Sequence, residues 1–313
     1  MRRSTPQGEH IPVLLEDVLT VLQPQPGEIV FDGTIGYAGH ASELLHEVGP
    51  QGRLIGTDFD PVNLQNARLR LEQEGSTFHL EHGNYASIQT ILGKLGIDGV
   101  DMLLVDLGMS SMQVDDPARG FSYVREGPLD MRMDPTRGKT AADLLMTLSE
   151  QELTEALETI GDEPNAAVIA KAIVTHRQTE IFSTTVELSR LIGHAVGQPV
   201  DREQGRKLRK GKKQWEIHPA ARTFQVLRIL VNRELANLEH LLRILPEVLK
   251  PGGRAAIISF HSGEDRRVKR AFKEGFAAGW YTAIADEPVR PRFDEQRRNP
   301  RSRSAKLRWA IKA

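Results

Sequence analysis

The feature that most constrains the fold is a regular alternation of short apolar segments with amphipathic ones in the first third of the chain. The apolar segments have the length and residue types of β-strands, and segments with helical spacing, such as 41–48 and 61–73, lie between them. Strands this apolar are typical of parallel sheets covered by helices on both faces. The alternation therefore predicts an α/β fold with a doubly wound sheet, in which ligands bind at the carboxyl ends of the strands. The predicted strands are 28–32, 52–58, 77–85 and 100–108.

A long helical stretch interrupts this pattern. Residues 134–215 are strongly charged and contain no convincing strand. Beyond them, a helical region leads to a turn and a buried strand in "KPGGRAAIISFHS", and "SAKLRWAIKA" alternates as a closing strand does. We therefore expect one discontinuous α/β domain, residues 1–133 and 216–313, interrupted by an all-helical insert at residues 134–215.

The first predicted strand runs into a loop with glycines at positions 33, 36 and 39. Glycine costs conformational entropy wherever it is ordered, so this spacing indicates a close approach of a ligand to the backbone. Asp58 ends the next strand about twenty residues later, where nucleotide-binding sheets place an acid on the ribose hydroxyls. The loop is neither the dinucleotide motif G-x-G-x-x-G nor a P-loop. A tight turn without a ligand is the alternative interpretation.

The kind of nucleotide is indicated further along the chain. The segment "LPEVLKPGGRAAIIS" reads as a helix, a Pro-Gly-Gly turn and a strand. This order is common in S-adenosylmethionine-dependent methyltransferases of the Rossmann-like class. Asp32, the acid that opens the glycine loop, favours the same cofactor over NAD. An NAD-dependent oxidoreductase is a weakly supported alternative, because the comparison is an analogy between folds.

A longer stretch carries a more specific resemblance. The segment "VDMLLVDLGMSSMQVDDPARGFSYVREGPLDMRMD" is similar to the bacterial 16S ribosomal RNA (cytosine-N4)-methyltransferase family, known as MraW or RsmH. The similarity continues in "HIPVLLEDVL", "DGTIGYAGH", "HPAARTFQVLRILVNREL", "ISFHSGEDRRVKRAF" and "SRSAKLR". It covers nearly the whole chain, apart from the middle of the insert and the segment before the C-terminus.

The resemblance implies a Rossmann-like class I methyltransferase sheet and S-adenosyl-L-methionine as the cofactor. It also implies methylation of the N4 amino group of a cytidine in the P-site decoding region of small-subunit (16S) ribosomal RNA. The expected partner is 16S ribosomal RNA within the small ribosomal subunit, the expected location is the cytoplasm, and a homodimer is compatible with the family. We expect neither a signal peptide nor a membrane span, because the first apolar run is short and contains Glu16 and Asp17. A non-catalytic RNA-binding assembly factor with the same fold is the alternative.

The family's cofactor-binding positions can be carried over to this sequence. The three residues after Tyr37 would line the methionine and ribose side of the cofactor, Asp58 would bind the ribose, and Tyr85 would lie near the adenine. This loop reads "GYAGH" where the family usually has "GRGGH", and "FHSGED" replaces "FHSLED". Structural roles are the alternative, since a tyrosine after a strand can pack at the core edge and a histidine can cap a helix. The implied cofactor set is Ala38, Gly39, His40, Asp58, Tyr85, Asp106 and Gln113.

No catalytic residue can be assigned from the sequence. Many amino-methyltransferases carry Asn/Asp-Pro-Pro-Tyr after the fourth strand, and this chain has "DLGMSS" there. An acceptor for the amine hydrogens could come from this loop, and the acids near Pro117 could equally be turn formers. The chain contains no cysteine, which excludes disulfides and thiolate metal sites, and we predict no metal. The candidate acceptors are Asp106, Ser110, Ser111, Asp115, Asp116 and His261.

Two basic blocks indicate the substrate. The segment "DREQGRKLRKGKKQ" has seven basic residues and two acids, although the net charge of the chain is −1. The segment "RPRFDEQRRNPRSRSAKLR" is similarly rich in arginine. Such blocks suit phosphate backbones, and Trp215 and Phe293 beside them could stack on bases, so the pair of blocks favours RNA over a solvated charged loop.

Overall fold

The structure is a computed structural model that describes residues 12–74, 77–198 and 218–313. The chain forms two compact units, residues 1–108 with 235–313 and residues 109–234. The basic block at 201–214 and Trp215 lie outside the described residues, so their part in RNA binding stays a prediction. In the described part of the chain, no helix combines the length and the apolar character that crossing a membrane requires.

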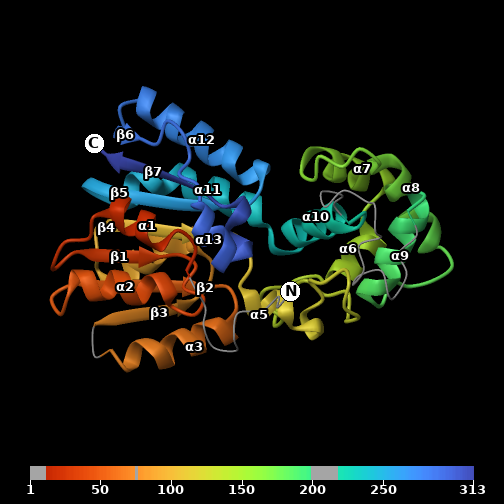
Figure 1. The fold of residues 1–313 in the computed structure, drawn as a ribbon, viewed down its shortest axis with the longest axis horizontal. Helices are drawn as coiled ribbons and strands as arrows, with labels where there is room; N and C mark the ends of the chain where they lie inside the picture. Colours follow the sequence, from red (N-terminus) through yellow and green to blue (C-terminus); the bar gives the residue numbers. More distant parts are fainter. Residues whose placement is uncertain (1–11, 75–76, 199–217) are drawn as a thin grey trace. The chain divides into compact units, whose positions relative to one another are not determined.

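The first unit is built on one seven-stranded sheet with the strand order β3-β2-β1-β4-β5-β7-β6 (Figure 1). The first five strands in this order are parallel, and β7 is antiparallel to both of its neighbours. The expected doubly wound α/β fold is confirmed. The strands are β1 (Ile29–Asp32), β2 (Arg53–Asp58), β3 (Phe78–His82), β4 (Val100–Asp106), β5 (Leu249–Ser259), β6 (Tyr281–Ile284) and β7 (Lys306–Lys312).

Helices cover both faces of the sheet, which explains why the strands are apolar on both sides. Val30 and Phe31 are neighbours in β1, both are fully buried, and they belong to opposite cores. The parallel register brings the ends of β1, β2 and β4, at Asp32, Asp58 and Asp106, to the same edge. One core includes α1 (Leu15–Leu22), α2 (Gly39–Val48) and α3 (Pro61–Glu72), and the other includes α4 (Ile88–Leu95), α11 (Glu234–Val248) and α12 (Ser262–Ala277).

The regular structure of the second unit is helical in its described residues, apart from one isolated bridge between Pro128 and Thr184, and residues 120–139 form turns and irregular chain. Capping boxes start four of its helices, with Ser110, Thr140, Ser149 and Thr184 as the N-cap residues. Such caps satisfy the first backbone donors of a helix and fix where it begins. Its helices are α5 (Ser111–Asp115), α6 (Ala141–Thr147), α7 (Glu150–Thr159), α8 (Ala166–His176), α9 (Thr185–Ala195) and α10 (Ala221–Asn232).

This helical unit is wider than the insert expected at 134–215. Its core takes Phe121 and Met131 from before that range, and Phe224 and Leu227 from after it. These side chains pack with the helices between them, so their segments belong to the same compact body. The helical insertion between β4 and β5 is confirmed, and its use for RNA recognition stays a prediction.

Candidate functional site

The glycine loop between β1 and α2 is fixed by the ends of the neighbouring strands. The Gly33 N–H donates to the Leu104 carbonyl of β4 at 2.9 Å. The Gly36 N–H donates to Oδ2 of Asp58 at 2.9 Å, and Oδ1 of the same carboxylate accepts the N–H of Asp60 at 2.8 Å. Asp58 therefore joins the end of β2 to the loop.

Two of the three loop glycines make room for other parts of the chain. A Cβ at position 33 would lie 2.6 Å from the Cβ of Tyr85, and one at position 39 would lie 2.7 Å from Cγ of Pro12. Gly36 instead has a φ of +51°, in the left-handed region that favours glycine. The spacing that suggested a ligand therefore also serves packing and backbone geometry.

Ala38 and His40 hold the loop to its surroundings. Ala38 has a φ of 57°, is fully buried, and donates its N–H to the Ile35 carbonyl at 2.6 Å. Nε2 of His40 lies 2.9 Å from the Val13 carbonyl, which can only accept, so this nitrogen carries the proton. Both residues therefore have clear structural roles beside their expected cofactor roles.

Four carboxylates gather at this edge of the sheet. Burial raises the pKa of Asp32 to about 7, and burial raises that of Asp58 to about 6. Burial and the charges of Asp32 and Glu264 raise the pKa of Asp106 well above its ordinary value. Among the described residues, nothing donates a hydrogen bond to the buried Oδ1 of Asp106. The site thus has an unsatisfied acceptor and negative potential, which suit a cationic ligand with N–H donors.

The remaining predicted cofactor residues lie in different units. Tyr85 begins the 3-10 helix η1 (Tyr85–Ser87) in the first unit and is 8% exposed. Gln113 is in α5 of the second unit, where its Oε1 accepts the N–H of Ser110 at 2.9 Å. Its own N–H donates to Oγ of Ser110 at 3.3 Å, which completes a capping box. Six of the seven expected residues therefore belong to the first unit, and their cofactor roles stay a prediction.

Most candidate acceptors for amine hydrogens already have partners. Nδ1 of His261 accepts the N–H of Gly263 at 3.2 Å, and Nε2 lies 3.1 Å from Oε1 of Glu264. Oδ1 of Asp116 accepts the N–H of Ala118 at 2.9 Å, which is the turn-forming alternative. Arg125 donates to the Asp115 carbonyl and lies 3.8 Å from its carboxylate. Asp106 differs from the other acids in this set, since its buried Oδ1 has no donor in the described part of the chain, and Nε2 of His261 likewise makes no hydrogen bond there.

Sequence reasoning did not single out Glu264, whose charge acts on Asp106. Its Oε2 accepts the N–H groups of Phe260 at 2.9 Å and His261 at 3.3 Å at the start of α12. Glu264 lies three residues after the N-cap residue, the spacing of a capping box, so the cap could have been found in the sequence. The sequence does not show that Glu264 is buried, with only 2% of the residue exposed.

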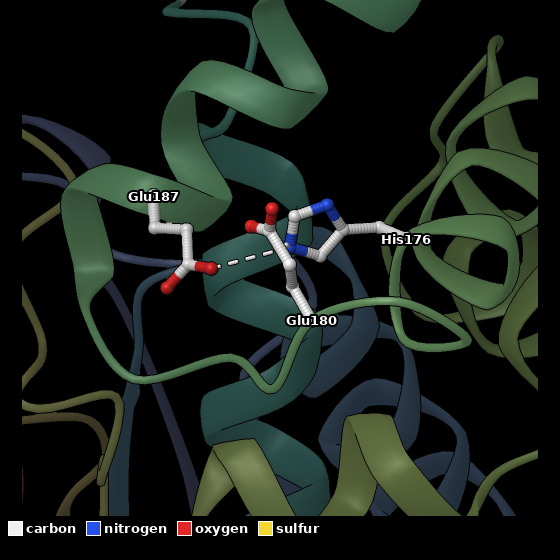
Figure 2. Close-up of side chains that lie close together, drawn as sticks. All are labelled: His176, Glu180 and Glu187. Carbon is white, nitrogen blue, oxygen red and sulfur yellow. Dashed lines mark hydrogen bonds and ion pairs between the residues drawn. The ribbon is translucent and has the colours of Figure 1, made fainter.

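A histidine and two glutamates meet in the second unit (Figure 2). Nε2 of His176 lies 3.2 Å from Oε1 of Glu187 and 3.9 Å from Oε2 of Glu180. The other oxygen of Glu187 accepts the N–H of Ser183 at 3.0 Å and that of Thr184 at 3.3 Å. This cluster therefore joins the end of α8 to the start of α9, a role that needs no metal.

Comparison with known proteins gives matches that extend over both units. A family model described as the MraW methylase family matches residues 7–313. Ribosomal RNA small subunit methyltransferase H 1 of Lachnoclostridium phytofermentans is 42% identical over 315 residues, which cover 99% of this chain and 83% of that protein. Ribosomal RNA small subunit methyltransferase H of Geobacter sp. strain M21 is 43% identical over 318 residues, which cover 96% of this chain and 97% of that protein.

Proposed function

This chain belongs to the MraW methylase family, and we propose that it transfers the methyl group of S-adenosyl-L-methionine to the N4 amino group of a cytidine in small-subunit ribosomal RNA. The observation that carries this proposal is the extent of the family match, residues 7–313, together with relatives named as small-subunit ribosomal RNA methyltransferases that match 96–99% of this chain. The motifs between 100 and 134 support a target in the P-site decoding region, which implies action on small ribosomal subunits in the cytoplasm.

The residues of the sheet edge fit this cofactor. Asp106 has a buried oxygen without a donor, and a sulfonium or ammonium group there would offset the repulsion among the carboxylates. Asp58 accepts two backbone N–H groups and, at 3.4 Å, the side-chain amide of Asn63, and a carboxylate has about four acceptor sites, so it can also hold a ribose hydroxyl. Ala38, Gly39 and His40 would line the cofactor beside the loop, and Tyr85 would lie near the adenine. Gln113, the remaining residue of the family's set, belongs to the second unit.

The cofactor supplies a methyl group that its sulfonium has already activated. The work left to the chain is orientation, which can lower a barrier by up to about 7–11 kcal/mol. The cytosine amine needs an acceptor that holds its hydrogens and aims its nitrogen. Asp106 is the described residue at this edge with an acceptor to spare, but we assign no catalytic residue. The methylated amine is acidic and can lose its proton to water afterwards.

Transfer of a labelled methyl group to ribosomal RNA tests the proposal. Small subunits and naked 16S ribosomal RNA from cells lacking the protein should be compared as substrates, followed by mass spectrometry of the nucleosides. We expect N4-methylcytidine to be formed at one position and to be absent from RNA of the deletion cells.

Tight RNA binding without transfer of a methyl group would favour the non-catalytic assembly factor instead. Binding of NAD but not of S-adenosylmethionine would overturn the methyltransferase. Light scattering of the same protein would test the expected homodimer.

A further inference from the structure

A short arginine-rich segment of the first unit forms a basic surface. Residues 290–303 contain six arginines, two acids and no lysine. They fold into α13 (Phe293–Arg298) and the 3-10 helix η3 (Pro300–Ser304), and all six arginines are exposed. Arginine binds phosphate through two parallel hydrogen bonds and stacks on bases, which lysine does not do. The segment therefore carries the side chains that suit a polyanion with aromatic bases.

Phe293 is exposed in the middle of these arginines. Its exposed fraction of 76% is the largest among the large hydrophobic side chains in the described ranges. A single exposed phenylalanine is ordinary on a protein surface. An exposed ring beside arginines is the arrangement with which proteins bind single-stranded nucleic acid, because the ring stacks on a base and the guanidinium groups pair with phosphates.

The backbone beneath this surface is well anchored. Val289 and Leu307 exchange both backbone hydrogen bonds at 2.9 Å, so the segment begins beside β7. Nε2 of Gln296 donates to the Pro291 carbonyl at 2.8 Å, and Ser302 is fully buried within η3. The ring of Phe293 is therefore presented by a fixed support while it contributes little buried area to the fold.

The same surface lies beside the glycine loop. Oε1 of Glu295 in α13 accepts the N–H of Leu14 at 2.9 Å. The preceding residue, Val13, accepts from His40 at 2.9 Å, and Pro12 lies against Gly39. Three consecutive residues span at most about 10 Å, so α13 and the loop lie on either side of a short segment. An RNA strand on α13 would therefore be close to the proposed cofactor.

We infer that this surface, defined as Arg290, Arg292, Phe293, Arg297, Arg301 and Arg303, binds a single-stranded RNA segment next to the target cytidine. This inference rests on the proposed function. A single strand is favoured over a duplex because Phe293 can stack only on an unstacked base. The arginines hold the backbone and the ring holds one base, which together aim the neighbouring nucleotide at the sheet edge.

Replacing the ring tests the stacking contact. Phe293→Ala should weaken binding of 16S ribosomal RNA and of a short single-stranded RNA by roughly tenfold in fluorescence anisotropy. Phe276→Ala is the matched control, since Phe276 is a half-exposed phenylalanine on α12 of the same unit. Equal affinities for the two variants would overturn the inference. Thermal unfolding should be unchanged in both, because neither ring is buried.

Replacing arginines tests the phosphate contacts. The triple variant Arg290→Gln, Arg297→Gln, Arg303→Gln should bind RNA with a slope against log salt that is smaller by about 2, since each lost contact removes about 0.7. The control Arg68→Gln, Arg243→Gln, Arg270→Gln removes the same charge from exposed arginines of the same unit and should keep the slope. Identical slopes would contradict the inference, whereas weaker RNA binding by the control would show a diffuse charge effect and overturn it.

The activity assay separates this inference from the proposed function. If the parent protein methylates ribosomal RNA and the α13 variants raise KM for RNA with kcat and cofactor affinity retained, both proposals hold. If the parent methylates but the variants match their controls, only the surface assignment fails. If the parent binds RNA through α13 but transfers no methyl group, only the proposed function fails.

Discussion

Asp58 Oδ2 accepts the backbone N–H of Gly36 at 2.9 Å, so the acid at the end of β2 holds the glycine loop directly. The other oxygen holds the N–H of Asp60 at 2.8 Å. In the proposed complex the same carboxylate also contacts the ribose. Experiments at this position must therefore distinguish the effect of a substitution on the loop from its effect on ligand binding.

Two variants of Asp58 make this separation. Asp58→Ala should weaken S-adenosylmethionine binding by about 1–3 kcal/mol, because charge-assisted hydrogen bonds are lost, and should also lower the melting temperature. Asp58→Asn retains an oxygen for the Gly36 N–H but turns its NH2 toward the N–H of Asp60, so it should keep more of the stability than Asp58→Ala and still lose affinity. Calorimetry and thermal unfolding measure the two effects. Parental affinity in Asp58→Asn would exclude a role for the charge.

Gly39 gives a prediction that the sequence alone would state differently. From the sequence, a side chain there would block only the cofactor. In the structure a Cβ would lie 2.7 Å from Cγ of Pro12, so Gly39→Ala should reduce thermal stability as well as binding. Gly93→Ala is the control, because a Cβ on this α4 glycine meets nothing within 4 Å and should stabilise the helix by up to about 1 kcal/mol. A fully stable Gly39→Ala would contradict this packing.

The stability of the first unit should depend on the charge of Asp32. Its pKa is about 7 in the folded protein against an ordinary 3.8, so folding favours the protonated acid. The resulting stability is full below the unfolded pKa and is lost as the pH rises through about 7. Asp32→Asn should become more stable relative to the parent over this range, by at most about 4 kcal/mol. Urea unfolding between about pH 4 and pH 8 measures this, and parallel curves would count against it.

Cofactor binding should release protons. A sulfonium beside Asp32 and Asp106 would lower their raised pKa values, so both acids would ionise on binding near pH 7. Calorimetry in buffers with different ionisation enthalpies should detect this release for S-adenosylmethionine. S-adenosylhomocysteine lacks the sulfonium charge and should release fewer protons. Equal release by the two compounds would place the cation away from these acids.

Glu187 should stabilise the second unit through its cap. Burial opposes its charge, but hydrogen bonds from Ser183, His176 and Thr184 outweigh burial and lower the pKa. This stability is present above the ordinary pKa and is lost as the pH falls. Glu187→Ala should cost about 1–2 kcal/mol in urea unfolding near pH 7. Glu180→Ala removes an exposed partner of the same histidine and should cost less than about 0.5 kcal/mol. Equal costs would contradict the capping role.

Local sequence patterns were sufficient for most strands. The apolar runs around β1, β2 and β4 coincide with strands, because a strand that is buried on both faces is apolar at nearly every position. The third strand was predicted to reach residue 85, but β3 ends at His82. Asn84 stops it, because its side chain accepts the N–H of Ala86 at 2.8 Å and starts η1.

The site was less predictable, since its contacts join distant segments. The side chain of Pro12 leaves no room for a Cβ at position 39, and the Val13 carbonyl accepts the hydrogen bond of His40. No sequence pattern predicts either contact. Asp58 could be placed because the end of a strand is a local feature. Oδ1 of Asp106 is buried without a donor from the described residues, and the acids whose charges act on Asp106, Asp32 and Glu264, come from distant segments of the sequence. Only the folded chain shows this arrangement.

The insertion between β4 and β5 also has a consequence for synthesis. Val100 of β4 pairs with Leu249 of β5, so the ribosome makes the entire helical unit before β4 can gain this neighbour. Closing so long a loop costs entropy, and a helical unit that has already folded shortens the flexible chain between the two strands. We therefore expect the helical unit to form while the sheet is still half built, with β5, β7 and β6 added only as the last residues leave the ribosome.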